Sequence, residues 1–173
     1  MAEITAINSL SGRNVFTMEI KIEKTKTPKA KPVDETKLGF GHIFTDHMFV
    51  MEYDTGKGWH DARIVPYGDI SISPAAMVLH YGQEIFEGMK AYRTPDGSIQ
   101  FFRPEENFKR MNISAERLVI PQLNVDDCLQ ALHELVKIDA DWVPHTDGAS
   151  LYIRPFIFAA DPFLGVRPGD KYY

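Results

Sequence analysis

Two stretches of the chain place apolar side chains at helical spacing. Between Pro104 and Leu118 the apolar positions are Phe108, Met111, Ala115 and Leu118, and Asn124 precedes a second stripe formed by Val125, Leu129, Leu132 and Val136. Such stripes are typical of amphipathic helices that bury one face. Two acids after Pro104 suit a helix start, and Asn124 suits a helix cap. A third helix is expected from Ser73-Pro74 to a stop at Gly88, with Val78, Tyr81 and Ile85 on one face.

Other stretches have the alternation or the β-forming composition of strands. The expected strands are Val15 to Glu23, Phe44 to Tyr53, Met89 to Arg93, Ile99 to Arg103 and Leu151 to Phe158. Thr94-Pro95-Asp96-Gly97 is a strong turn signal between the third and the fourth. Helices and strands do not alternate regularly. The pattern therefore predicts an α+β fold, with a mostly antiparallel sheet packed against two or three helices.

The composition changes near Leu38, where the compact part of the chain is expected to begin. Residues 1–36 are predicted to form an N-terminal strand followed by a Lys/Pro-rich extension, and residues 37–161 a folded domain. The basic run from Lys24 to Lys31 is short and interrupted by proline, so it is interpreted as a solvated linker.

Charge and composition exclude several classes of function. With 173 residues, a net charge of -5 and no long basic cluster, the chain does not resemble a nucleic-acid-binding protein. Cys128 is the only cysteine, which excludes an internal disulfide and a thiolate metal cluster. The sequence shows neither a membrane-spanning apolar run nor a signal peptide, so a cytoplasmic location is expected.

Common catalytic and metal-binding patterns are not found. The six histidines lack the spacing of a metal site, and no G-x-S-x-G, Walker or dinucleotide-binding pattern occurs. Cys128 lies within a predicted amphipathic helix, where a buried structural thiol is expected.

Arg103, Arg110 and Arg117 recur every seven residues and would share one helix face. Periodicity alone favours a solvated cationic face, and the alternative is an anion site in which one guanidinium binds a phosphate.

Two further basic residues stand among apolar neighbours. Arg154 lies in the segment LYIRPFIF, where it needs either a structural acid partner or a ligand carboxylate. Lys90, in FEGMKAY, could be a reactive amine with a lowered pKa or a surface lysine whose stem covers apolar groups. Spacing does not decide between these alternatives.

The chain resembles the amino-terminal small domain of branched-chain amino acid aminotransferases, which are fold-type IV pyridoxal-phosphate enzymes. The similar stretches are LGFGHIFTDHMF, LHYGQEIFEGMKAY, FFRPEENFKRM, DWVP, SLYIRP and DPFLGV, which together extend from about Leu38 to Val166. FEGMKAY and LYIRP are closer to branched-chain enzymes than to the related D-amino acid aminotransferases or aminodeoxychorismate lyases.

The resemblance implies pyridoxal 5′-phosphate as cofactor and a role for individual residues. Arg110 matches the position that binds the cofactor phosphate, and Arg154 the guanidinium that meets the side-chain carboxylate of glutamate. Leu164 and Val166 match a loop pair that reaches into the pocket of a partner subunit, which implies a homodimer. The other implied substrate-binding positions are Phe40, Tyr81, Phe86, Lys90 and Tyr152. The substrates would be leucine, isoleucine or valine, glutamate and the corresponding 2-oxo acids.

One departure from the family is its length. Members of the family are longer, and their Schiff-base lysine lies in a carboxy-terminal large domain, so residues 162–173 are interpreted as an interdomain linker. No catalytic residue is therefore assigned here, and the chain alone is predicted to be inactive. We also expect Arg110 and Arg154 to lack partners within the chain. The alternatives are a non-enzymatic anion-binding or dimerisation module, or another fold-type IV enzyme.

Overall fold

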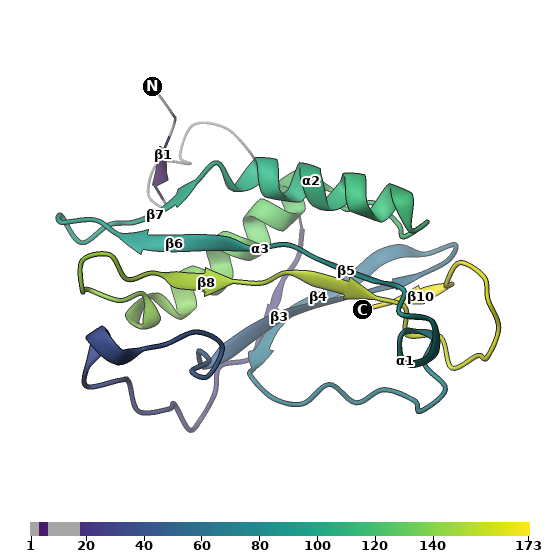
Figure 1. Cartoon of the computed structure of the whole chain (residues 1–173), viewed down its shortest axis with the longest axis horizontal. Helices are drawn as coiled ribbons and strands as arrows, with labels where there is room; N and C mark the ends of the chain where they lie inside the picture. Colours follow the sequence, from purple (N-terminus) through teal and green to yellow (C-terminus); the bar gives the residue numbers. More distant parts are fainter. Residues whose placement is uncertain (1–3, 7–17) are drawn as a thin grey trace.

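The computed structural model describes residues 4–6 and 18–173, and Figure 1 shows the arrangement of its elements. One four-stranded antiparallel sheet has the order β1 (Ile4–Ala6), β7 (Ile99–Phe102), β6 (Met89–Arg93) and β8 (Leu151–Ile153). A second has the order β10 (Lys171–Tyr172), β3 (His47–Asp54), β4 (Gly58–Pro66) and β2 (Lys21–Ile22), with β2 and β4 parallel. A third pairs β5 (Glu84–Phe86) with β9 (Phe156–Phe158). The predicted α+β class is confirmed.

The two long helices are those that the apolar stripes predicted. They are α2 (Pro104–Arg117) and α3 (Val125–Ile138), and the Asn124 side chain accepts hydrogen bonds from the N–H groups of Asp126 and Asp127. Short 3₁₀ turns, η1 (Glu35–Lys37) and η2 (Ala140–Trp142), complete the helical content with α1 (Met77–Tyr81). None of the described helices is long and apolar enough to cross a membrane.

One hydrophobic core joins the helices to the sheets. α2 contributes Phe108, Met111 and Ala115, and α3 contributes Leu132 and Val136. The sheet residues packed against them are Met89, Ala91, Ile99, Phe101, Ile157 and Tyr172. Leu118, predicted as the last member of the α2 stripe, is instead 42% exposed because the helix ends before it, and Ile120 is buried in its place.

The helix expected between Ser73 and Gly88 is much shorter than predicted. Gly82 adopts φ +63°, and its N–H donates to the carbonyl of Val78, which ends α1 after Tyr81. Glycine takes this left-handed conformation at low cost, so it often terminates helices. The residues that follow form β5, and Ile85 is therefore a strand residue rather than part of a helix face.

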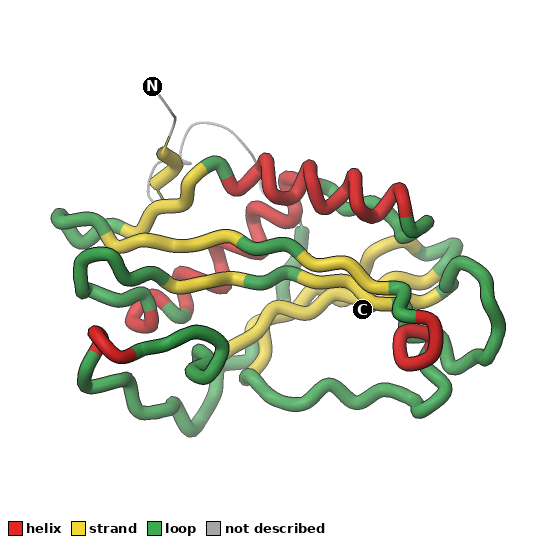
Figure 2. The backbone as a smooth tube through the Cα atoms, viewed as in Figure 1, coloured by secondary structure: helices red, strands yellow, loops and turns green. Residues whose placement is uncertain are grey.

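The last predicted strand, Leu151 to Phe158, is interrupted. Its two halves, β8 and β9, pair with β6 and β5, and Figure 2 shows the two pairs of strands following one another along the molecule. Pro155 has no N–H to donate, which explains the break between Ile153 and Phe156. The pairing register is continuous across it, because Met89 pairs with Ile153 and Phe86 with Phe156. Gly88 therefore lies opposite Arg154.

Three further expectations about local structure need correction. The segment that includes Trp59 and Ile64 forms β4, which the polarity pattern did not predict. Of the strand expected from Val15 to Glu23, only Lys21–Ile22 is a strand within the described part, and residues 15–17 lie outside it. Arg103 has φ +46° and precedes α2, so it does not continue the arginine face of that helix.

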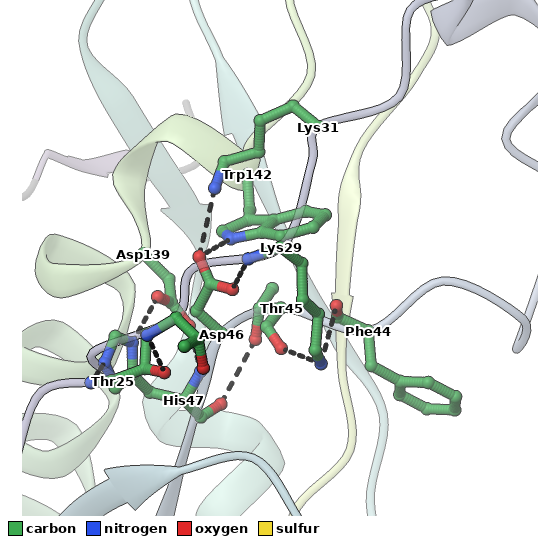
Figure 3. A network of polar contacts seen from close by, with 10 residues as sticks. Thr25, Lys29, Lys31, Phe44, Thr45, Asp46, His47, Asp139 and Trp142 are labelled. Atoms are coloured by element: carbon green, nitrogen blue, oxygen red, sulfur yellow. Dashed lines mark hydrogen bonds and ion pairs between the residues drawn. The ribbon is translucent and has the colours of Figure 1, made fainter.

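The Lys/Pro-rich segment is mostly exposed, as expected of a solvated linker, but specific contacts also bind it to the fold (Figure 3). The N–H of Thr25 donates to His47 Nε2 (2.9 Å), and Lys29 Nζ donates to the carbonyl of Thr45 (2.8 Å). Lys31 Nζ pairs with Asp46 (3.1 Å) and lies 4.0 Å from the centre of the Trp142 ring. These contacts hold the segment against residues 44–47, where β3 begins.

Asp46 is the acidic centre of this network. Its carboxylate accepts the Lys29 N–H at Oδ1 (2.8 Å), and at Oδ2 the Trp142 indole N–H (2.9 Å) and the Lys31 ammonium. Burial alone would raise the pKa of Asp46, but these donors outweigh it and lower the pKa from 3.8 to about 2. Because the folded-state pKa is lowered, Asp46 stabilises the fold fully above pH 4, and the contribution is lost as pH falls towards 2.

We expect Asp46→Asn to lower the free energy of unfolding at pH 7 by about 2 kcal/mol. In the asparagine variant the side-chain oxygen can keep the hydrogen bond from the Lys29 N–H. The side-chain NH₂ group then faces the Trp142 N–H and the Lys31 ammonium, which are both donors. The difference from the wild type should shrink between pH 4 and pH 2, measured by urea denaturation across that range. Asp69→Asn, at an exposed position, is the matched control and should leave stability unchanged. A pH-independent Asp46→Asn effect would contradict this account.

Candidate functional site

The candidate site lies where the β5–β9 pair continues into the β6–β8 pair. Residues that face each other across an antiparallel pair share one side of the sheet. On one side, Phe86 and Lys90 of the first chain segment lie opposite Phe156 and Tyr152 of the second. Gly88 and Arg154 occupy the position between them. The sheet thus presents a row of aromatic side chains with one guanidinium in its middle.

Arg154 is held by aromatic groups rather than by an acid. Its guanidinium donates to the Tyr152 hydroxyl from Nη2 (3.2 Å) and lies 4.5 Å from the centre of the Phe86 ring. Within the part of the chain that the structure describes, no carboxylate pairs with Arg154, so the structural ion pair considered from the sequence is not formed. The guanidinium is therefore oriented by these contacts and accessible to an external anion.

Gly88 has no side chain, and the Tyr152 side chain occupies the space next to it. A Cβ atom at this position would lie 2.5 Å from the Tyr152 hydroxyl and 3.0 Å from the ring. Glycine is therefore required by close packing, since the Gly88 backbone φ is not in the left-handed region. The Tyr152 ring also meets the Phe40 ring edge-on, with 4.9 Å between centroids. Phe40, which is 65% exposed, closes one end of the aromatic row.

The network of Figure 3 supports the loop that carries Phe40. This loop runs from Leu38 into β3, and its end is fixed by Lys29, which donates to the carbonyl groups of Phe44 and Thr45. The Phe44 ring stacks on Tyr67 at 4.9 Å, and Lys29 Nζ lies 4.3 Å from the Tyr67 centroid. The Lys/Pro-rich segment thus restrains the loop next to the aromatic row.

Arg110 lies on the helix side of the same strand segment. Its guanidinium donates to the Glu87 carboxylate from Nε (2.5 Å) and from Nη2 (2.7 Å). The expectation that Arg110 has no partner within the chain is therefore wrong. The Glu87 carboxylate raises the pKa of Arg110, and the Arg110 hydrogen bond in turn lowers the pKa of Glu87. The Arg110 side chain is nevertheless 65% exposed.

The other predicted site residues do not join these contacts. Tyr81 is 42% exposed at the end of α1, and its ring is near His80. Lys90 is exposed on β6, opposite Tyr152. Leu164 and Val166 are 62% and 88% exposed in the loop before β10. These four side chains are available at the surface.

The remaining candidate groups lack a catalytic arrangement in the described residues. No group of three or more His, Cys, Asp or Glu side chains there could hold a metal ion. Burial raises the pKa of the Cys128 thiol to about 12, so it is a structural thiol, as predicted. His47 is a buried partner of Asp139, with Nδ1 at 2.7 Å from the carboxylate, which is a structural role.

Sequence reasoning missed Glu87 and Asn107. The available signal was an acid between Phe86 and Gly88, because a carboxylate in such an apolar setting needs a partner. That partner is Arg110, at a distance of 23 residues along the chain, and no local pattern indicates it.

Comparison with solved structures places this fold in a known class. Branched-chain amino acid aminotransferase from Escherichia coli is 25% identical with a TM-score of 0.52, over 72% of this chain and 38% of that chain. A T.th. branched-chain amino acid aminotransferase complexed with N-(5′-phosphopyridoxyl)-L-glutamate is 29% identical with a TM-score of 0.50, over 70% and 38% of the two chains. The fold is that of the small domain of fold-type IV aminotransferases.

Sequence relatives define the family. The chain is 54% identical over 153 residues to branched-chain-amino-acid aminotransferase 2 of Bacillus subtilis, covering 88% of this chain and 42% of the relative. It is 48% identical over 163 residues to the Mycolicibacterium smegmatis enzyme, covering 92% and 44%. A scan against models of protein families found no match. The chain belongs to the branched-chain aminotransferases, spans less than half the length of these relatives, and fits an amino-terminal fragment of such an enzyme.

Proposed function

We propose that this chain provides the substrate- and cofactor-binding small domain of an aminotransferase that moves the amino group of leucine, isoleucine or valine to 2-oxoglutarate. We place residues 37–161 in that domain, and β2 and β10, which lie before and after this range, add strands to one of its sheets. Residues 162–173 are proposed to lead on from it into a large domain. The relatives support this assignment, since the chain matches only 42–44% of their length. The cytoplasm is the proposed location.

The observation that carries the proposal is the aromatic row around Arg154. Phe40, Phe86 and Tyr152 offer apolar surface that suits a branched alkyl side chain. Arg154, held against Phe86 and Tyr152, offers the charge that a second carboxylate of glutamate or 2-oxoglutarate needs. One pocket wall can therefore serve both kinds of substrate.

The donor set of Arg110 fits the phosphate of pyridoxal 5′-phosphate. Glu87 accepts from Nε and Nη2, and Nη1 makes no hydrogen bond to any described residue. The exposed edge of the guanidinium can thus donate to phosphate oxygens, the pairing for which its planar geometry is suited. The cofactor, when bound, supplies the electron sink for the amino transfer.

Tyr81 and Lys90 complete the proposed substrate surface, and Leu164 and Val166 are the proposed contribution of each subunit to its partner in a homodimer. The exposure of Leu164 and Val166 supports this arrangement, because two large apolar side chains on one loop are suited to burial at an interface.

The reacting lysine is proposed to lie outside this chain, which predicts a loss of activity in isolation. The 173-residue chain, incubated with pyridoxal 5′-phosphate, leucine and 2-oxoglutarate, should form no glutamate above the protein-free background. The complete protein should form glutamate with leucine, isoleucine and valine. A coupled glutamate assay on both proteins is the measurement. Turnover by the chain alone would contradict the assignment and would implicate a lysine such as Lys90.

A further inference from the structure

Glu87 is a buried carboxylate with an unusually complete set of donors. Its side chain is 7% exposed and accepts two hydrogen bonds from Arg110. Oε2 also accepts from the Gly88 N–H (3.1 Å) and from Asn107 Nδ2 (3.2 Å). Asn107 donates in addition to the Gly88 carbonyl (3.1 Å). Two residues of α2 and the strand segment around Gly88 thus meet at one carboxylate.

The contacts of Glu87 fix the orientation of the Arg110 side chain, which would otherwise sample many rotamers. A free arginine side chain loses up to about 2 kcal/mol of conformational entropy when it is immobilised on an anion. Glu87 holds Arg110 through two parallel hydrogen bonds while most of the side chain is exposed. The guanidinium is therefore oriented before any ligand arrives, and Nη1 faces away from the Glu87 contact.

We propose that Glu87 is the positioning residue for Arg110, and that it strengthens binding of the cofactor's phosphate by presenting the guanidinium in a fixed orientation. This inference rests on the proposed function. Through Asn107 and Gly88, the same carboxylate ties the phosphate-binding arginine to the strand that carries Phe86, a wall of the substrate pocket. A purely structural ion pair that only holds α2 to β5 is the competing account.

A positioning role and a purely structural role of Glu87 predict different effects on ligand affinity. Only the positioning role makes the loss of affinity depend on the phosphate group of the ligand. Apo forms of the complete protein are titrated with pyridoxal 5′-phosphate and with pyridoxal, which carries the same aldehyde without the phosphate. Glu87→Gln should weaken pyridoxal 5′-phosphate binding about tenfold, because the glutamine NH₂ group faces an Arg110 donor. Pyridoxal binding should change less than about twofold, since that ligand makes no contact that requires Arg110.

A double-mutant cycle tests whether Glu87 acts through Arg110. In an Arg110→Ala background, Glu87→Gln should cause no further loss of pyridoxal 5′-phosphate affinity. Asn107→Ala leaves the ion pair between Glu87 and Arg110 in place. It should weaken pyridoxal 5′-phosphate binding less than Glu87→Gln does, and it should likewise have little effect on pyridoxal binding. Glu106→Gln is the matched control on α2, where Glu106 pairs with Lys109 at 2.8 Å, and it should bind both ligands as the wild type does.

The outcomes separate the two proposals. If Glu87→Gln and Asn107→Ala weaken the binding of pyridoxal 5′-phosphate and of pyridoxal equally, Glu87 has a structural role and the positioning role is overturned. Unchanged pyridoxal 5′-phosphate affinity would overturn it as well. A wild-type protein that binds no pyridoxal 5′-phosphate would overturn the proposed function, and this inference with it.

Discussion

Replacing Arg154 by glutamine in the complete protein is expected to lower kcat/KM for 2-oxoglutarate about 100-fold, which corresponds to the loss of a charge-assisted interaction of roughly 2–3 kcal/mol. The guanidinium is oriented by the Tyr152 hydroxyl and the Phe86 ring, so under the proposed function it should bind the second carboxylate without rearrangement. The 2-oxo acid of leucine has no second carboxylate. Its kcat/KM should therefore change less than about threefold.

The measurement compares the two 2-oxo acids as amino acceptors for the same donor. Arg117→Gln serves as the control, because Arg117 is an exposed arginine at the end of α2 and lies outside the aromatic row. It should leave both values unchanged. A similar decrease for both acceptors after Arg154→Gln would show that Arg154 maintains the pocket rather than recognising a carboxylate.

Replacing Asp139 by alanine is expected to destabilise the fold by about 3 kcal/mol. Asp139 is 3% exposed and accepts from the His47 N–H (3.0 Å) and from His47 Nδ1 (2.7 Å). His47 Nε2 accepts the Thr25 N–H, so the ring proton is on Nδ1 and is directed at Asp139. Alanine would leave two buried donors without an acceptor.

Equilibrium urea denaturation at pH 7 measures this effect. Asp141, two residues further along, is exposed, and Asp141→Ala should change the free energy of unfolding by less than about 0.5 kcal/mol. A loss below about 1 kcal/mol for Asp139→Ala would mean that water replaces the carboxylate, and that the network of Figure 3 is not a main anchor of the Lys/Pro-rich segment.

The parts of the fold that depend on local physics could be predicted from the sequence. The helices α2 and α3 follow from their apolar stripes and from the Asn124 cap. The β6–β7 hairpin follows from its turn, in which Gly97 has φ +84°. Two errors came from local signals that were present but not used. Gly82 ends α1 early, and Pro155 divides the last strand.

The remaining features depend on contacts between distant residues. Glu87 and Arg110 are 23 positions apart in the sequence, and His47 and Asp139 are 92 positions apart. Neither pair can therefore be recognised from a periodic pattern of residues. The basic run from Lys24 to Lys31 is exposed, as predicted, but its contacts were missed for the same reason, because its partners Asp46 and Trp142 lie elsewhere in the chain. The proposed roles of Arg110 and Arg154 came from family resemblance, and the structure adds how each guanidinium is held.

We propose that two arginines of this chain bind two different anions, Arg110 the cofactor phosphate and Arg154 the side-chain carboxylate of glutamate. The most direct measurement is a crystal structure of the complete protein with N-(5′-phosphopyridoxyl)-L-glutamate, the compound present in the T.th. complex. We expect Arg110 within hydrogen-bond distance of the phosphate, still paired with Glu87, and Arg154 within hydrogen-bond distance of the side-chain carboxylate. A complex in which the phosphate is held without Arg110, or in which Arg154 contacts no ligand carboxylate, would contradict the account.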